Sequence, residues 1–279
     1  MDNMNEQKDP LADLGVILYY INLDRDTARR DDMEQQAREQ GVLLHRIPGV
    51  FGADLKPEDL RSYDDKRRKR LSTASLGMGE LGCLLSHIKA FRTFLDSDAR
   101  YAVIFEDDAV ILPEFSDKLR YIIEHTSGWG YVKLYSDPTK MYETDINPEG
   151  TEVKLAFHKK LPWKTVAYML TREAAKKLLN LFTDRYWLPV DAQLAYFLMR
   201  YDIPAPGVME NIVSTRYPFN EQSTINEMED RRAPEPGNSQ KHCICRSLVR
   251  YLNYRWHTWT MSYLKLRGRH TLRKKLQFR

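Results

Sequence analysis

The sequence predicts an α/β fold in which helices cover both faces of a central sheet, giving three layers. Short β-branched and aromatic runs alternate along the chain with longer segments whose apolar residues recur at helical spacing. Such alternation is typical of chains that wind strand after helix into one sheet. A length of 279 residues, of which 42% are hydrophobic, suits one large domain with an appendage.

Six short apolar runs have the composition of buried strands, being rich in β-branched and aromatic residues. These strands are expected over residues 15–23, 43–50, 101–105, 131–135, 153–158 and 166–170. The run 15–23 reads G-V-I-L-Y-Y-I-N-L and has no breaker after its glycine, so we expect a buried first strand there.

Five longer segments suit helices, and the segment 79–95 shows the apolar periodicity most plainly. The helices are expected over residues 24–41, 79–95, 115–125, 172–181 and 190–200. Asp24 or Asp26 suits the N-cap of the first helix, and Asp191 lies in the first turn of the last one.

Two stretches between these elements are poor in apolar residues. Residues 55–76 are dense in charge, with D-D-K-R-R-K-R at 64–70, and predict an exposed excursion. Residues 212–240 contain Pro218, Pro234 and Pro236, which predicts a flexible linker or an active-site flap. We therefore expect a body over residues 1–240 and a separate tail over residues 241–279.

The tail combines a basic composition with an apolar stripe. Between Arg246 and Arg279 there are ten Lys or Arg and no Asp or Glu. Apolar residues recur at helical spacing from Leu248 to Leu266, including Trp256 and Trp259. A basic amphipathic helix with tryptophans is typical of interfacial binding to an anionic membrane. Packing of the stripe on the body or on a second subunit, and binding of nucleic acid, are the alternatives.

Composition bears on the compartment as well. No segment approaches the roughly 20 apolar residues that span a membrane, and the polar N-terminus does not resemble a signal peptide. The odd set of cysteines, Cys83, Cys243 and Cys245, makes no disulfide framework. These features favour a protein of the reducing cytoplasm.

Three carboxylates follow the strand expected over 101–105: Glu106, Asp107 and Asp108. Ligand sites of open α/β sheets lie at such strand ends. The triplet suits a divalent cation that neutralises a diphosphate, two-metal nuclease or polymerase chemistry, or an acid/base pair, and a solvated acidic turn is the structural alternative. Carboxylate oxygens suit Mg²⁺ or Mn²⁺ rather than zinc. No Cys/His constellation competes for a transition metal, since H-C-I-C at 242–245 lacks a second half.

Six short motifs occur in a fixed order along residues 15–225. They are Y-I-N-L-D-R at 20–25, R-I-P-G-V at 46–50, G-E-L-G-C-L-L-S-H at 79–87, Y-A-V-I-F-E-D-D-A at 101–109, Y-M-L-T at 168–171 and P-V-D at 189–191. Each motif alone is weak, but the ordered set resembles glycosyltransferase family 25, the lipopolysaccharide and procollagen-type galactosyltransferases. The resemblance implies a GT-A-type, Rossmann-like domain, a UDP-sugar donor, often UDP-galactose, and an inverting reaction.

The resemblance assigns the acidic residues. Glu106 and Asp108 stand at the outer positions of a D-x-D motif, with Asp108 as the direct ligand of Mn²⁺ or Mg²⁺ and Glu106 at the metal shell or the ribose. Asp107 points into the sheet or to the donor sugar. An inverting transfer needs one base, and Asp191 is the candidate, with an N-cap or a metal ligand as its alternative roles.

Other residues are candidates for the donor site. Asn22 suits uracil or ribose, because a polar residue inside a buried strand needs a partner. Arg25 and Arg29 suit the phosphates, unless they are simply exposed on the helix. Glu80 lies near a helix start, and His87 is either a donor-site or a structural histidine. Cys83, among leucines, is expected to be a small core hydrophobe.

Together these inferences predict an inverting glycosyltransferase peripheral to the inner face of the cytoplasmic membrane in a bacterium. It would transfer a hexose, galactose first, from a UDP-hexose to the oligosaccharide of a lipopolysaccharide or lipooligosaccharide. No nucleic acid is expected as a partner. A metal-dependent nucleic-acid enzyme and an inactive glycosyltransferase-like adaptor for membranes or partners are the competing hypotheses.

Overall fold

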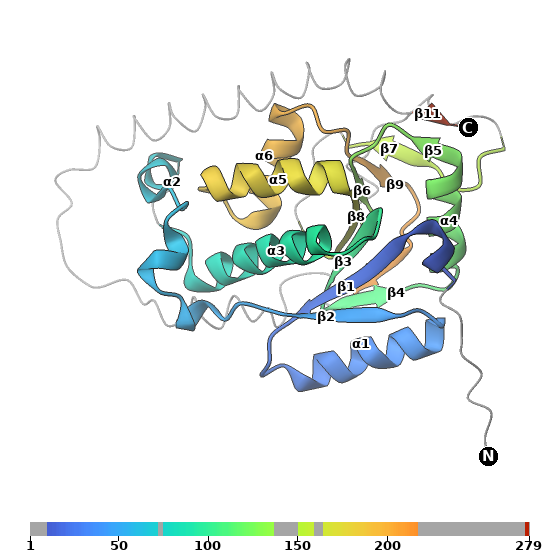
Figure 1. The fold of residues 1–279 in the computed structure, drawn as a ribbon, viewed down its shortest axis with the longest axis horizontal. Coiled ribbons are helices and arrows are strands. Elements are labelled where there is room, and N and C mark those ends of the chain that lie inside the picture. Colours follow the sequence, from blue (N-terminus) through green and yellow to red (C-terminus); the bar gives the residue numbers. More distant parts are fainter. Residues whose placement is uncertain (1–9, 72–74, 137–149, 159–163, 217–276, 279) are drawn as a thin grey trace.

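The computed structural model describes residues 10–71, 75–136, 150–158, 164–216 and 277–278. Its centre is a seven-stranded sheet in the order β2-β1-β3-β8-β6-β9-β7 (Figure 1). The strands are β1 Val16–Asn22, β2 Leu44–Pro48, β3 Tyr101–Glu106, β6 Tyr131–Lys133, β7 Leu155–Phe157, β8 Ala167–Thr171 and β9 Pro206–Val208. Two short antiparallel pairs lie outside this sheet, β4 Ala109–Ile111 with β10 Val213–Thr215 and β5 Thr126–Ser127 with β11 Gln277–Phe278.

The direction of the strands decides which residues meet at one edge of the sheet. β2 and β3 both run parallel to β1, whereas β8 runs antiparallel to β3 and to β6. β9 runs parallel to β6, and β7 runs antiparallel to β9. The ends of β1, β3 and β6 therefore lie at the same edge as the beginning of β8. We call this the carboxyl edge, and the opposite one the amino edge.

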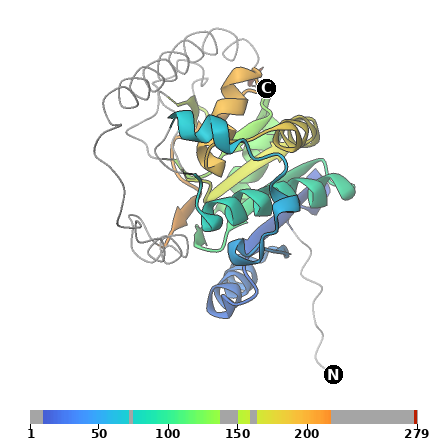
Figure 2. The ribbon, with the colours of Figure 1, turned by 90° about the vertical axis from the view of Figure 1, so that its left-hand side faces the viewer.

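Helices on both faces complete the three layers (Figures 1 and 2). The α-helices are α1 Thr27–Gln40, α2 Asp65–Leu71, α3 Met78–Asp96, α4 Phe115–His125, α5 Arg172–Asp184 and α6 Val190–Arg200, and the short 3-10 helices are η1 Ala12–Leu14, η2 Gly52–Asp54 and η3 Pro57–Leu60. One hydrophobic core contains side chains of α1 and α4, and the other contains side chains of α3, α5 and α6. Among the described residues, no helix has the length and apolar content needed to cross a bilayer.

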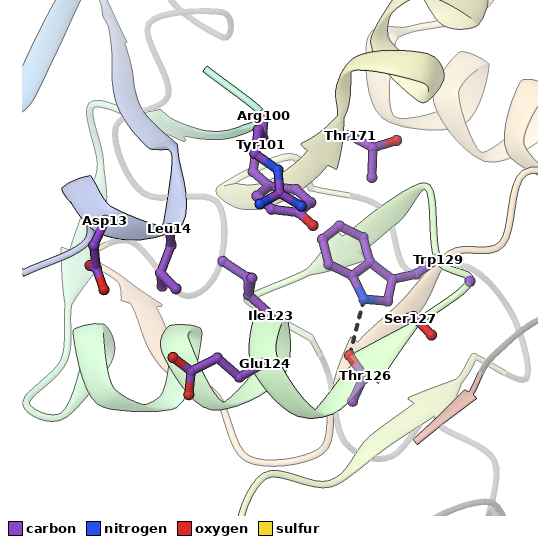
Figure 3. A pocket seen from close by; sticks show the side chains of 11 residues that line it. Asp13, Leu14, Arg100, Tyr101, Ile123, Glu124, Thr126, Ser127, Trp129 and Thr171 are labelled. Atoms are coloured by element: carbon purple, nitrogen blue, oxygen red, sulfur yellow. Dashed lines mark hydrogen bonds between the residues drawn. The ribbon is translucent and has the colours of Figure 1, made fainter. Parts of the chain in front are cut away.

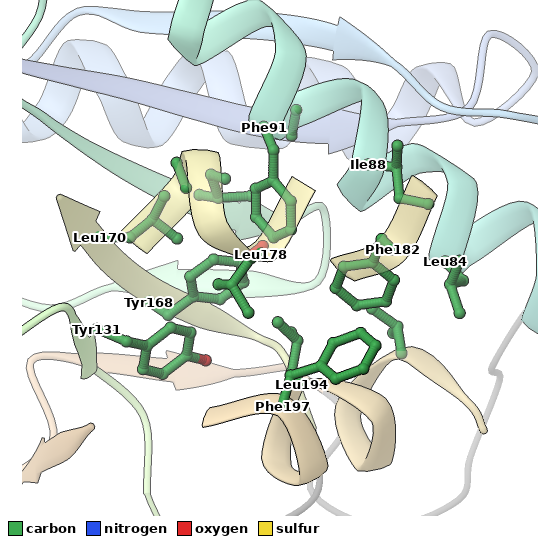
Figure 4. Close-up of a cluster of buried hydrophobic side chains, with 14 of the residues drawn as sticks. Leu84, Ile88, Phe91, Tyr131, Tyr168, Leu170, Leu178, Phe182, Leu194 and Phe197 are labelled. Atoms are coloured by element: carbon green, nitrogen blue, oxygen red, sulfur yellow. The ribbon is translucent and has the colours of Figure 1, made fainter. Parts of the chain in front are cut away.

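The alternation of side chains along the central strands explains the two cores. In β3, Val103 and Phe105 face the core of α1 and α4, while Ala102 and Ile104 face the other core. Because successive strand residues point to opposite faces, a strand covered on both sides must be apolar throughout. Figure 4 shows the second core, where rings and aliphatic chains of the sheet, α3, α5 and α6 interdigitate.

A close contact at the start of α3 fixes how this helix lies on the sheet. A Cβ added at Gly82 would come 2.6 Å from the carbonyl oxygen of Val50, so only glycine allows this approach. One turn later, the Ser86 hydroxyl donates to the carbonyl of Gly82 at 2.7 Å and accepts the amide of Val50 at 2.8 Å. The helix face that carries Cys83 and His87 is thereby held against the sheet.

The three-layer α/β fold expected from the sequence is confirmed. All six expected strands are present, as β1, β2, β3, β6, β7 and β8, and all five expected helices are present, as α1, α3, α4, α5 and α6. The short strands β4, β5, β9, β10 and β11 were not expected.

Two expectations about irregular segments were wrong in part. The predicted exposed excursion over 55–76 contains η3 and α2, and Leu60, Tyr63 and Leu71 pack against the second core. The predicted linker over 212–240 begins instead with a strand, in which Val213 is fully buried. Residues 217–276, with most of the predicted tail and its amphipathic helix, lie outside the described residues.

Candidate active site

The carboxyl edge gathers polar side chains from four segments of the sheet. Asn22 ends β1, Glu106 ends β3, Lys133 ends β6, and Thr165 lies just before β8. Asn22 is 1% exposed and Lys133 is 4% exposed, so both polar groups are removed from water. Burial of polar groups at the end of an otherwise apolar sheet requires specific partners, and these partners define the site.

Asp107 joins the sheet to α1. Its Oδ2 accepts from Asn22 Nδ2 at 2.8 Å and its Oδ1 accepts from an Arg29 guanidinium nitrogen at 3.0 Å. Asn22 is saturated in turn, because its Nδ2 also donates to the Asp26 carbonyl at 3.0 Å and its Oδ1 accepts from Arg46 Nε at 3.0 Å. Burial raises the pKa of Asp107, while Asn22 and Arg29 act in the opposite direction. Asn22, Arg29 and Asp107 thus form one closed hydrogen-bonded group.

Glu106 faces the opposite side of the triplet. Its Oε1 accepts from the Thr165 hydroxyl and lies 3.4 Å from His87 Nε2. Burial would raise the pKa of Glu106, but the neighbouring His87, the Thr165 hydroxyl and the Lys133 ammonium outweigh it and lower the pKa. Glu106 is therefore held as a carboxylate at neutral pH.

Asp108 is the member of the triplet in which one carboxylate oxygen lacks a hydrogen-bond partner among the described residues. Its Oδ2 accepts from the Thr215 hydroxyl at 3.0 Å, and its backbone carbonyl accepts from the Arg216 amide at 2.9 Å. Its Oδ1 is buried and has no hydrogen-bond partner among the described residues. Burial and the charge of Glu106 raise the pKa of Asp108 to about 6. A bound cation would relieve both the repulsion and the missing contact, so these carboxylates fit the hard divalent ion expected from the sequence.

Asp191 and Lys133 are connected through one backbone segment. The Asp191 Oδ2 accepts from the Lys164 amide at 3.1 Å, and its Oδ1 accepts from the Ala192 amide at 2.7 Å. The carbonyl of the same Lys164 accepts from Lys133 Nζ. Burial lowers the pKa of Lys133 to about 8, while the charges of Asp191 and Glu106 oppose that shift. The N-cap of α6 is Pro189, so the N-cap interpretation of Asp191 is wrong.

Sequence reasoning missed Lys133 and Thr215. Lys133 occupies a buried strand position between Val132 and Leu134, where a lysine is as unusual as Asn22 is in β1. That unusual placement was the available signal. Thr215 gave no signal, because it lies in a stretch that was interpreted as a linker.

Two predicted donor-site residues have structural partners. Glu80 Oε2 accepts from the Gly77 amide at 2.7 Å and closes a capping box at the start of α3. The Arg25 guanidinium lies 4.6 Å from the ring centroid of Phe51 and 3.8 Å from Asp26 Oδ1. The donor-site roles of Glu80 and Arg25 stay predictions.

The amino edge carries an open pocket of about 410 Å³ (Figure 3). Tyr101 and Trp129 lie along it with ring centroids 5.4 Å apart. Its acidic residues, Asp13 and Glu124, are both paired with Arg120, at 2.7 Å and 3.1 Å. Among its described lining residues, the pocket therefore holds no unpaired carboxylate comparable to Asp108, and it lies across the sheet from the triplet.

Comparison with known families now decides the classification. A sequence model described as glycosyltransferase family 25 (LPS biosynthesis protein) matches residues 17–194. The chain belongs to glycosyltransferase family 25. Within this family, the chain is 26% identical over 193 residues to a glycosyltransferase 25 family member of Drosophila pseudoobscura pseudoobscura, a match that covers 66% of this chain and 30% of that protein.

Further relatives show the range of the family. The chain is 24% identical over 192 residues to procollagen galactosyltransferase 2 of Mus musculus, covering 67% of this chain and 31% of the relative. It is 27% identical over 186 residues to a probable inactive glycosyltransferase 25 family member 3 of Bos taurus, covering 62% and 30%. The chain thus spans about 30% of the length of these curated relatives. A solved glycosyltransferase involved in glycosylation of the major capsid of PBCV-1 overlays with a TM-score of 0.40 at 10% identity, covering 77% of this chain and 97% of that one.

Proposed function

We propose that this family 25 chain transfers a hexose, galactose first, from a UDP-sugar to a glycan acceptor with inversion at the sugar carbon. The observation that carries the proposal is the buried Oδ1 of Asp108, which has no hydrogen-bond partner among the described residues and lies beside the ionised Glu106. A sugar-diphosphate donor needs positive charge where its leaving group departs, and this pair of carboxylates suits the cation that would provide it.

Asp108 and Glu106 would hold a Mn²⁺ or Mg²⁺ ion, which supplies charge neutralisation for the diphosphate when bound. Lys133 adds a protein cation in the same region, because its charge acts on both Glu106 and Asp191. Asn22 and Arg29 contribute indirectly: they fix Asp107, and the neighbouring backbone of the triplet is fixed with it.

Asp191 is the proposed base. The acceptor hydroxyl oxygen forms the new bond to the sugar carbon, and its proton passes to a carboxylate oxygen of Asp191. The bond between that carbon and the diphosphate oxygen breaks, and its electron pair leaves with UDP. The amides of Lys164 and Ala192 orient the Asp191 carboxylate, one on each oxygen. A single oriented base is what an inverting transfer needs.

The acceptor we propose is the oligosaccharide of a lipopolysaccharide or lipooligosaccharide, at the inner face of a bacterial cytoplasmic membrane. The family description names lipopolysaccharide biosynthesis. The ten basic and no acidic residues between Arg246 and Arg279 support a location at an anionic surface. Relatives named procollagen galactosyltransferases make collagen the acceptor to test against it.

The first experiment measures thermal stabilisation of the full chain by UDP, with and without Mn²⁺. A ligand at about one hundred times its Kd should raise the Tm by roughly 5–10 °C. Asp108→Asn should abolish the manganese-dependent part of this shift. Asp13→Asn, at the amino edge, is the matched control and should preserve it. An unchanged shift in Asp108→Asn would remove Asp108 from the proposed site.

Transfer itself is tested with UDP-hexoses and lipooligosaccharide or collagen peptides, and NMR of the product gives the anomeric configuration. An α-linked product from an α-linked donor would contradict inversion. A second candidate function is a binding protein without turnover, and the Bos taurus relative that is named as a probable inactive family member supports testing it. Manganese-dependent UDP binding with no transfer to either acceptor would favour that candidate. Salt-sensitive nucleic-acid binding without a UDP effect would favour the nucleic-acid alternative.

A further inference from the structure

A second group of potential metal ligands lies beside the carboxylate triplet. Cys83 and His87 are four residues apart on α3, so their side chains lie on the same helix face. One ligand atom each of Cys83, His87 and Glu106 lies within 4.8 Å of the other two. The sequence-based analysis expected no Cys/His constellation for a transition metal and did not consider this group. The fold brings Glu106 to a cysteine and a histidine that are about twenty residues earlier in the chain.

His87 shows that this group is arranged for a ligand. The residue is 1% exposed, and its Nδ1 lies 2.7 Å from the Tyr168 hydroxyl. Its Nε2 is buried without a hydrogen-bond partner among the described residues, 3.4 Å from Glu106 Oε1. A ligand between Nε2 and Glu106 would need the Nε2 lone pair, and the ring proton would then lie on Nδ1, where the Tyr168 hydroxyl can accept it. A hydrogen bond from the far ring nitrogen is how proteins orient histidines that bind metals.

We propose that Cys83, His87 and Glu106 form an inhibitory zinc site that shares Glu106 with the proposed donor site. A thiolate sulfur, an imidazole nitrogen and a carboxylate oxygen are the ligands that zinc binds in proteins. Soft sulfur disfavours Mg²⁺ and Mn²⁺ at the same place. Zinc bound there would withdraw Glu106 from Asp108 and weaken the binding of the donor with its cation.

The geometry is compatible with one ion. Zinc bonds of about 2.0–2.3 Å place tetrahedral ligand atoms roughly 3.5 Å apart. The His87 and Glu106 atoms already meet this spacing at 3.4 Å. All spacings in the group are within 4.8 Å, so zinc binding would need the ligand atoms to approach by at most about 1.3 Å. Three protein ligands leave one position for water. On binding, the Cys83 thiol loses its proton to solvent, and the thiolate and the carboxylate together balance the charge of the ion.

Cobalt gives a direct readout, because Co²⁺ in a zinc site with a thiolate ligand has a sulfur-to-cobalt charge-transfer absorption. The measurement uses the full chain carrying Cys243→Ser and Cys245→Ser, which removes the two other cysteines. We expect one equivalent of Co²⁺ to produce the band, and Zn²⁺ to remove it. Cys83→Ala should abolish the band. Cys83→Ser, which keeps nearly the same volume, is the second variant if the Tm of Cys83→Ala falls.

Two results would overturn the zinc site: no thiolate band in the parent protein, or a band that persists in both Cys83 variants. His87→Gln should weaken Co²⁺ binding at least tenfold, and unchanged binding would also contradict the proposal. Binding of cobalt does not depend on turnover, so this readout is independent of the acceptor.

The inhibitory role rests on the proposed donor site and is tested separately. Zn²⁺ should suppress the manganese-dependent UDP stabilisation in the parent protein and leave it intact in Cys83→Ser. Asp108→Asn should lose the manganese-dependent part of the UDP stabilisation while keeping the cobalt band. A cobalt band without any UDP effect in the parent protein would sink the proposed function and leave the zinc site standing. Equal suppression by Zn²⁺ in the parent and in Cys83→Ser would sink the inhibitory role.

Discussion

The two edges of the central sheet both carry charged side chains, and they differ in whether those charges have partners. At the amino edge, Asp13 and Glu124 are both paired with Arg120 at the protein surface. At the carboxyl edge, Asp108 has one buried oxygen without a partner in the described part of the chain, and the charge of Glu106 acts on it. Water can solvate the first group, whereas the second stays uncompensated until a ligand binds.

The same contrast exists within the acidic triplet. Both oxygens of Asp107 receive hydrogen bonds, from Asn22 and Arg29. Asp108, its neighbour in sequence, accepts a hydrogen bond at Oδ2, while its Oδ1 accepts none from the residues that the structure describes. A buried carboxylate whose oxygens both accept hydrogen bonds contributes to the stability of the fold, whereas a buried carboxylate oxygen without a partner lowers that stability. Variants at these positions should therefore separate carboxylates that stabilise the fold from carboxylates that bind a ligand.

The largest effect is expected at the proposed base. Asp191→Asn should lower kcat by about 10²–10⁴-fold, because the amide cannot accept the proton of the acceptor hydroxyl. Stabilisation by UDP and Mn²⁺ should persist, since Asp108 and Glu106 are unchanged. Single-turnover transfer and thermal shifts measure the two effects. Loss of the UDP shift together with turnover would instead assign Asp191 to the cation.

The next largest effect is expected when the hydrogen-bonded group of Asn22, Arg29 and Asp107 is broken. Asn22→Leu keeps the shape of the side chain but removes its hydrogen bonds to Asp107, Asp26 and Arg46. Several buried polar groups then lose partners, so the free energy of unfolding should fall by about 2–4 kcal/mol. Denaturant unfolding at neutral pH provides the measurement, and a change below the error of extrapolation would show that this group is not a structural unit.

The third effect has the opposite sign. The pKa of Asp108 is raised to about 6 in the folded protein, above the value of about 3.9 in an unfolded chain. The folded state therefore binds more protons between about pH 4 and pH 6, and its stability falls as the pH rises through this window. Asp108→Asn should remove that slope and raise the free energy of unfolding at pH 7 by about 1–3 kcal/mol. Parallel pH profiles for the two proteins would refute this assignment.

The smallest effect is expected at the amino edge. Asp13→Asn breaks one of the two ion pairs of Arg120 at the surface. The free energy of unfolding should change by less than about 1 kcal/mol, and this change should shrink further in high salt. Donor binding and the response to Zn²⁺ should be unaffected. A large loss of donor binding in Asp13→Asn would mean that the two edges are coupled and that the comparison fails.

The sequence predicted the frame of the molecule well because periodicity reports burial over long segments. The helix expected over 115–125 and α4 have the same bounds, as do the one expected over 190–200 and α6. The strand β9 was not expected, because its three residues, Pro206–Val208, begin with a proline and a glycine, which are rare inside strands. The placement of the acidic triplet after β3 was likewise predictable, because strand ends are visible in an apolar pattern.

The partners of the triplet were harder to predict, since they depend on contacts between distant segments. Thr165 and Thr215 reach Glu106 and Asp108 from residues 59 and 107 positions away. Glu80 was interpreted as a donor-site residue. It follows Gly77 by three positions, and this is also the spacing of a capping box at a helix start. Cys83 fits a leucine-rich helix as a core residue, and only the fold reveals Glu106 beside it.

The two groups that hold Asp108 come late in the sequence. All seven strands of the central sheet have been made once β9 ends at Val208. The Thr215 hydroxyl and the Arg216 amide, which hold Asp108, leave the ribosome only afterwards. The side chain of Arg216 then ties the same segment to Asp32 of α1, with Nε 2.9 Å from Oδ2. A chain that stops before Ile212 therefore contains all seven strands of the central sheet but lacks both groups that hold Asp108.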